Sequence, residues 1–390
     1  MSKKLIKYGG AMVGFGEVWA IIKSVLRSCW TGNWQQNKEG DLLEKESAAF
    51  LGVKHGILTS SGSCAALLAM EALEIPKNKG YEVIISAVTF PTVFNIILQC
   101  GLVPVVVDAE VGTYNMKISE VEKAISKKTK AIIAIHAVGN PVDMPALMKI
   151  ARRHKLKVIE DGCDTFGGSI NGKMLGSFGD ISITSFHAAH IVSMGVGGGV
   201  FTNDDKLAQN VRVYRDWGRQ ANTTDPHTCK TLPADYNPRF VYDKIGYNFQ
   251  ILDLQAAMGR VQLRKAKKIK ELRKKNFDWL VRNLKSSDIG DWLMMPTSPE
   301  GSDVCWFALP LTYSGDRGKL VAHLEKNGIE TRSLFSGNIT RHSAYVDSKY
   351  RISGKLKGAD MILNQSFWIS LHPRLTQKDR QRILDAFNSY

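Results

Sequence analysis

Short apolar runs alternate with amphipathic stretches through the middle of the chain. The apolar runs predict buried strands at 81–87, 103–108, 130–137, 157–161, 180–186 and 199–202. Amphipathic stretches predict helices at 93–100, 118–125 and 144–154, each between two of these strands. This alternation predicts an α/β fold, in which a mostly parallel sheet carries helices on both faces.

The pattern changes after residue 250. A long helix without proline is predicted for 254–286, followed by an extended segment at 306–313 and a helix at 319–327. A short strand at 368–371 and a closing helix from Thr376 complete the chain. We therefore expect a large domain at 1–250 and a smaller C-terminal α+β domain at 251–390 that begins with the connecting helix.

The longest stretch without charge, 83–107, is interrupted by Pro91 and Pro104, so we expect a buried strand–helix–strand unit rather than a membrane span. No apolar segment follows the basic residues at the N-terminus, so no export signal is expected. The six cysteines form no C-x-x-C pair, which favours reduced thiols. Together these features predict a cytoplasmic protein.

The chain is basic, with 52 Lys and Arg against 37 Asp and Glu. The densest basic run, 264–275, has helical spacing, with Ile269 and Leu272 between the charges, and we expect it to be a solvated helix face. It has no interleaved aromatic residues, so nucleic-acid binding is not expected. The positive field would also favour a phosphate-bearing substrate.

Three clusters are candidates for chemistry. The first, 59–65, is a turn of small residues before an apolar helical run, and free N–H groups at such a helix start suit a phosphate. An ordinary helix capped by Ser63 explains it equally well.

The second, 158–164, is an apolar strand that ends in three acids. A carboxylate there could pair with a protonated ring nitrogen, or simply cap a helix or a turn.

The third cluster, 182–200, places His187 and His190 between a strand and a group of glycines. Zinc binding is not expected, because no third ligand lies at the usual spacing. Without further context, a histidine in such a loop is usually a surface hydrogen-bonding group.

The chain resembles the DegT/DnrJ/EryC1/StrS family of pyridoxal-phosphate-dependent nucleotide-sugar aminotransferases, from about residue 10 to the C-terminus. The resemblance implies the type I (aspartate aminotransferase) fold. It is carried by an ordered set of motifs: Ser61–Ser63, Thr89–Thr92, Val138–Met144, Glu160–Asp161, Gly176–Asp180, Ser185–Phe186, Gly197–Gly198, Thr202–Asp204 and Gly246–Asn248.

The resemblance also implies roles around the cofactor phosphate. Gly62 and Ser63 take the positions of phosphate-binding residues, and Ser185 lies beside them. Asn248 matches an asparagine that reaches the phosphate from the neighbouring subunit, which implies a homodimer.

Around the cofactor ring, Phe90 takes the place of the aromatic residue that stacks on the pyridine. Asp161 takes the place of the carboxylate that faces the pyridine nitrogen. Asp164 stands where the aminotransferases usually have glutamine, near the ring hydroxyl.

One departure from the family changes the expected chemistry. Aminotransferases of this family read roughly S-F-H-x-x-K where this chain reads Ser185-Phe-His-Ala-Ala-His190. Lysine forms an imine with the cofactor aldehyde, whereas imidazole cannot form that bond but can still move protons. We therefore expect non-covalent cofactor, most simply pyridoxamine phosphate, with His190 as the catalytic base.

The histidine is similar to that of the nucleotide-diphospho-4-keto-6-deoxyhexose 3-dehydratases, above all the branch acting on CDP-4-keto-6-deoxyglucose. These enzymes remove the C3 hydroxyl as water in dideoxysugar and lipopolysaccharide biosynthesis. Further segments resemble this branch: 215–219, 246–249, 328–332, 336–341 and 364–368. Transamination on the same fold and a non-catalytic protein that binds nucleotide sugars are the alternatives.

The CDP-sugar branch also holds an iron–sulfur cluster through cysteines. Cys163 stands where the first ligand would be, but Ala221, Thr223 and Thr231 occupy the other positions, with only Cys229 nearby. Because four thiolates usually hold such a cluster, we expect no cluster and no other metal. This favours an amino donor such as glutamate over a partner reductase.

Three residues are candidates for binding the nucleotide-sugar substrate. Arg332 and Arg341 could grip phosphate or sugar, since arginine matches diphosphate oxygens with paired donors. A surface salt bridge explains Arg341 equally well. Trp34 could line the substrate entrance, although a packed tryptophan is the commoner case.

Overall fold

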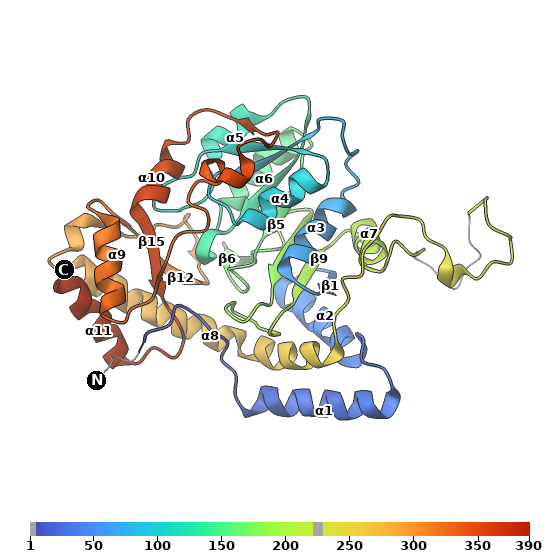
Figure 1. The fold of residues 1–390 in the computed structure, drawn as a ribbon, viewed down its shortest axis with the longest axis horizontal. Helices are drawn as coiled ribbons and strands as arrows, with labels where there is room; N and C mark the ends of the chain where they lie inside the picture. The colour runs from blue at the N-terminus through green and yellow to red at the C-terminus, as the bar shows by residue number, and fades with distance from the viewer. Residues whose placement is uncertain (1–4, 221–228) are drawn as a thin grey trace.

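The computed structural model describes residues 5–220 and 229–390, and within them eight strands form the main sheet (Figure 1). Their order is β1-β9-β8-β5-β4-β2-β3-β14. All neighbours are parallel except β9, which is antiparallel to both β1 and β8. The predicted mostly parallel sheet is confirmed. The bounds are β1 His55–Thr59, β2 Glu82–Ser86, β3 Val103–Val107, β4 Thr129–Ile135, β5 Lys157–Asp161, β8 Ile181–Ser185, β9 Gly198–Thr202 and β14 Arg351–Ile352.

Helices cover both faces of this sheet. Successive strand residues point to opposite faces, so Val83 and Ile85 pack on one side and Ile84 on the other. The first side is covered by α3 (Gly62–Ala72), α4 (Pro91–Gln99) and α7 (Asp205–Arg215). The second side is covered by α5 (Ile118–Ala124) and α6 (Met144–Arg153). The central strands are therefore buried on both faces, as their mostly apolar sequences predict, whereas the edge strand β14 is partly exposed.

A second sheet of four strands lies in the C-terminal part, in the order β10-β12-β15-β13. It packs against α9 (Arg317–Lys326) and α11 (Gln377–Asn388) around a separate apolar core. Its strands are β10 Leu293–Met294, β12 Ala308–Tyr313, β13 Thr331–Arg332 and β15 Ser366–Ser370, and a small third sheet joins β6 Ser169–Ile170, β7 Lys173–Met174 and β11 Ser302–Asp303.

The helix α8 (Asp253–Lys285) connects the two parts, and α2 (Lys38–Leu51) packs against it. In Figure 1, α1 (Phe15–Thr31) runs beside α8 at the edge of the molecule. Strand β14 and helix α10 (Lys357–Gln365) return from the C-terminal part to the main sheet and its core. The domain boundary at residue 250 stays a prediction.

Most expected elements are found within a few residues of their predicted bounds. The uncharged stretch is the predicted strand–helix–strand unit of β2, α4 and β3. The basic run lies on α8, where Ala266 and Ile269 are buried and most of the lysines are exposed, although Arg273 is fully buried. Within residues 5–220 and 229–390, no helix combines the length and apolar character of a membrane span.

Candidate active site

A cavity of about 630 Å³ opens at the carboxyl ends of β4, β5 and β8, where ligands bind in parallel α/β sheets. Its wall also includes residues of the C-terminal part of the chain. The wall brings together most of the residues predicted for the site: Gly62, Ser63, Phe90, Asp161, Asp164, Ser185, His190 and Arg332.

The start of α3 and the end of β8 form a small polar cradle in this wall. The cap of α3 is Ser61, whose Oγ accepts a hydrogen bond from Cys64 N at 3.1 Å, so the capping role considered for Ser63 is wrong. Ser63 Oγ instead lies 3.2 Å from Thr92 Oγ1. A Cβ on Gly62 would lie 2.8 Å from Ser185 Cβ, so only glycine fits this approach. Free N–H groups at the helix start, with these hydroxyls, fit a phosphate.

The acids that end β5 point in different directions. Asp161 lines the cavity, and its Oδ1 accepts a hydrogen bond from Cys163 N at 3.0 Å. Burial raises the pKa of the Asp161 carboxyl above its ordinary value. Glu160 faces away and accepts backbone hydrogen bonds from the loop that contains Gly176 and Phe178. Of the two neighbours, only Asp161 can meet a ligand, and a cationic ring nitrogen would offset the cost of its burial.

His190 lies between Asp164 and the ring of Phe307. Its Nδ1 is 3.3 Å from Asp164 Oδ1, within ion-pair distance but not aligned as a hydrogen bond. The centroid of the Phe307 ring is 5.4 Å away. His190 Nδ1 and Asp164 Oδ2 are both buried without a hydrogen-bond partner in the described structure. Asp164 can therefore stabilise the imidazole when it gains a proton.

His136, which follows β4 directly, is a cavity residue that the sequence analysis missed. Its Nδ1 accepts a hydrogen bond from Val142 N at 3.1 Å, so in the neutral ring Nε2 carries the hydrogen. That nitrogen lies 3.4 Å from Glu160 Oε2. The position of His136 at a strand end, next to Asp161, is the signal that could have found it.

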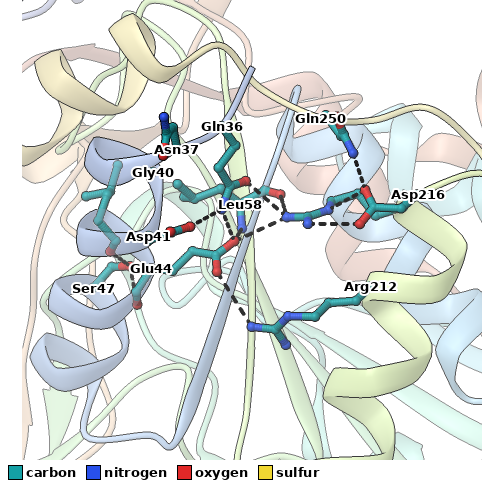
Figure 2. Close-up of polar contacts among 12 residues, drawn as sticks. Gln36, Asn37, Gly40, Asp41, Glu44, Ser47, Leu58, Arg212, Asp216 and Gln250 are labelled. Atoms are coloured by element: carbon teal, nitrogen blue, oxygen red, sulfur yellow. Dashed lines mark hydrogen bonds and ion pairs between the residues drawn. The ribbon is translucent and has the colours of Figure 1, made fainter. Parts of the chain in front are cut away.

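Asn248 does not line the cavity of its own chain, and its backbone contacts another segment instead. It pairs with Asp216 in an isolated β-bridge, and Gln250 Nε2 donates to Asp216 Oδ1 at 2.8 Å. The neighbouring Arg215 is buried and donates to Glu44 and to Leu58 O, which anchors the segment to α2 and β1. Figure 2 shows Glu44 and Leu58 together with the Gln250–Asp216 contact. The segment that carries Asn248 is thus fixed to the large sheet.

Two other predicted residues also lie outside the cavity wall. Arg341 contacts Asp360 through Nε at 2.9 Å and Nη2 at 2.6 Å, the salt bridge considered as its alternative. Trp34 is 42% exposed, and its carbonyl accepts a hydrogen bond from Asp253 N. Neither residue lines the cavity of its own chain, and their contacts with the substrate stay a prediction.

The cysteine positions are only partly described. Cys163 lines the cavity, and Cys229 Sγ lies 3.2 Å from Thr231 Oγ1, while Ala221 and Thr223 fall outside the described residues. Within the described ranges, no three His, Cys, Asp or Glu side chains cluster as metal ligands. The expectation of no iron–sulfur cluster stays a prediction.

Comparisons with a family model, with two related proteins and with one solved structure bear on this site. The model of the DegT/DnrJ/EryC1/StrS aminotransferase family matches residues 17–388. The lipopolysaccharide biosynthesis protein RfbH of Salmonella typhimurium is 37% identical over 98% of this chain and 90% of its own. The dTDP-4-dehydro-2,6-dideoxy-D-glucose 3-dehydratase of Saccharopolyspora spinosa is 38% identical over 89% of this chain and 79% of its own.

The structure of E. coli GDP-4-keto-6-deoxy-D-mannose-3-dehydratase with bound hydrated PLP has a TM-score of 0.89 at 25% identity, covering 98% of this chain and 100% of that one. The predicted fold is confirmed.

Proposed function

Because this chain belongs to the DegT/DnrJ/EryC1/StrS aminotransferase family, we propose that it is a nucleotide-diphospho-4-keto-6-deoxyhexose 3-dehydratase that uses non-covalent pyridoxamine phosphate. The observation that carries this proposal is His190 at the position of the family lysine. His190 faces the cavity beside Asp164, and none of the described residues that line the cavity is a lysine. A histidine there can move protons but cannot tether the cofactor.

The residues present fit this cofactor. Gly62, Ser63 and Ser185 would bind its phosphate at the start of α3. Phe90, which is 55% exposed on the cavity wall, would pack against its ring, and the Asp161 carboxylate would hold its ring nitrogen protonated. When bound, the cofactor supplies an amine for the substrate ketone and a pyridinium that accepts electrons.

The proton transfers would fall to His190. Its Nδ1 faces Asp164, so Nε2 is the nitrogen left to take up a proton and to return it. The Asp164 carboxylate would stabilise the imidazolium between these two events. The C3 hydroxyl would leave as water, and the cofactor's amine nitrogen would leave as ammonia when the sugar regains its ketone. An amino donor such as glutamate, oxidised to its keto acid, would restore the pyridoxamine form.

The second candidate is transamination, which the family description favours. To separate the two, the protein loaded with pyridoxamine phosphate is incubated with glutamate and with CDP-, GDP- or dTDP-4-keto-6-deoxyhexose. Product mass is then measured. We expect one sugar to lose one oxygen and keep its ketone. Exchange of the ketone for an amine would contradict the dehydratase and support the aminotransferase.

A homodimer is part of this proposal. The outer face of α1 exposes a stripe of apolar side chains at helical spacing: Phe15, Val18, Trp19, Ile22, Leu26 and Trp30. Such a face is a typical protein-interaction surface, and a second copy of the chain would bury it. By the family resemblance, Asn248, which does not line its own cavity, would reach the partner's cofactor in this dimer.

We expect the double substitution Leu26→Glu and Trp30→Glu to convert a dimer into a monomer. The two side chains are 62% and 93% exposed, so the isolated chain should remain folded. Light scattering after size exclusion measures the mass. Trp292→Glu, at a tryptophan that is 55% exposed elsewhere, is the control and should leave the dimer intact. A wild-type monomer, or a dimer that survives the α1 charges, would contradict the interface.

A further inference from the structure

The segment Ile6–Met12, here called the strap, is tied to the C-terminal part of the chain before α1 begins. Ile6 N donates to Gly328 O at 2.8 Å, and Ile6 O accepts from Glu330 N at 3.1 Å. Further along, Gly10 O lies 3.0 Å from His372 Nε2. These bonds, on both sides of Tyr8, fix the strap where it forms part of the cavity wall.

The strap also touches the loop that carries the proposed base. A Cβ on Gly9 would lie 3.5 Å from Ala189 Cβ, which is ordinary van der Waals contact. Ala189 is the residue before His190. The strap therefore joins the β13 region to the loop of the proposed base.

Tyr8 is placed under the guanidinium of Arg332. The guanidinium carbon lies 4.2 Å from the centroid of the Tyr8 ring, within the range of a cation–π interaction. Glu330 bridges the two residues, because one carboxylate oxygen accepts from Tyr8 N at 2.8 Å and the other lies 2.5 Å from Arg332 Nη2. Arg332 Nη1 also donates to Thr331 O at 2.7 Å.

These contacts hold the guanidinium in one place and leave part of it for a ligand. Arginine has five N–H donors, and the bonds to Glu330 and Thr331 O engage two of them. The Arg332 side chain remains 42% exposed and lines the cavity. A guanidinium whose rotamer is already fixed loses less conformational entropy when it binds an anion.

A row of aromatic rings joins this pair to the proposed base. Tyr8 contacts Trp368 with ring centroids 5.6 Å apart, and Trp368 contacts Phe307 at the same distance. Phe307 in turn packs against His190 at 5.4 Å. One continuous wall thus has the proton-transfer group at one end and a fixed cation at the other.

From this arrangement we infer that Tyr8 is a positioning residue, which holds Arg332 to receive the diphosphate of the nucleotide-sugar substrate. The inference rests on the proposed function for the class of substrate. The sugar would lie along the aromatic wall between the two ends, with its reacting carbons near His190. The N-terminal strap would then be part of the substrate site.

The test measures binding of CDP, GDP and dTDP to the protein loaded with pyridoxamine phosphate, by calorimetry. For the nucleotide that binds the wild type, we expect Tyr8→Leu to raise the Kd about tenfold. Tyr8→Phe keeps the ring face and should stay within about twofold. In turnover, Tyr8→Leu should raise KM and leave kcat nearly unchanged. Tyr390→Leu, at a tyrosine that is 44% exposed outside the cavity, is the matched control.

A double-mutant cycle separates positioning from a general loss of structure. In the background of Arg332→Met, Tyr8→Leu should add almost nothing, because the group that it positions is gone. An unchanged Kd in Tyr8→Leu, additive losses in the double variant, or a wild type that binds none of the three nucleotides would overturn the inference. If no sugar is deoxygenated while nucleotide binding still depends on Tyr8, the proposed reaction fails and the positioning role of Tyr8 stands.

Discussion

Replacement of His190 by asparagine is expected to lower kcat for C3 deoxygenation by about a thousandfold. Asparagine is close in size to imidazole and can form hydrogen bonds, but it cannot take up the proton that the reaction moves. His190 is not one of the residues proposed to bind the cofactor phosphate, so we expect the affinity for pyridoxamine phosphate to change less than about threefold. Product mass measures turnover, and an absorbance titration measures cofactor binding.

His187 provides the matched control for this substitution. It lines the same cavity, and its imidazole pKa is lowered by partial burial and by the nearby His190. His187 is exposed and contacts His190 edge-on, with ring centroids 6.1 Å apart. We expect His187→Asn to retain at least a tenth of the wild-type kcat. If the two variants lose activity equally, or if His190→Asn loses less than tenfold, the proton transfer belongs to another group.

The sequence predicted the parts of this structure that depend on local pattern. Six strands of the main sheet were predicted because they are buried on both faces and therefore appear as apolar runs in the sequence. Strands β1 and β14, at the two edges of the sheet, were not predicted. Asp161 and Gly62 were found because a strand end and a helix start have local signatures. The sequence analysis made no prediction for α1, although its apolar side chains recur at helical spacing. What that pattern could not show is the direction of the stripe, which faces outward instead of toward the core.

The remaining parts of the site depend on contacts between distant segments. Tyr8 is near the N-terminus, whereas Phe307 and Trp368 belong to the C-terminal part of the chain. No local sequence pattern marks any of the three as a cavity residue. Topology alone brings them into one wall. Arg341 is a second example. An arginine suits a diphosphate ligand, and only the fold shows that Asp360 pairs with this one.

Replacement of Asp161 by asparagine is expected to have opposite effects on stability and on function. Burial raises the pKa of this carboxyl in the folded protein above its ordinary value of 3.8, which applies to the unfolded chain. At pH values between the unfolded and the folded pKa, the folded protein therefore binds more protons than the unfolded chain. The free energy of unfolding therefore falls as pH rises through that interval. Without cofactor, the buried Asp161 carboxylate therefore destabilises the folded protein at pH values above its ordinary pKa. The neutral amide of the Asp161→Asn variant would remove this destabilisation, and we expect the cofactor-free variant to be about 1 kcal/mol more stable than the wild type.

With cofactor, the same substitution should be harmful, because a protonated ring nitrogen loses the carboxylate that stabilises it. We expect the affinity for pyridoxamine phosphate to fall ten- to a hundredfold and kcat to fall by more than a hundredfold. Urea unfolding of the cofactor-free protein between about pH 4 and 8 measures the first effect, and absorbance titration measures the second. Asp288→Asn, at an exposed aspartate, should change neither. If Asp161→Asn is less stable without cofactor yet binds cofactor normally, then Asp161 stabilises the fold and does not serve the cofactor ring. The reason is that a carboxylate kept for a cationic partner lowers the stability of the protein when that partner is absent.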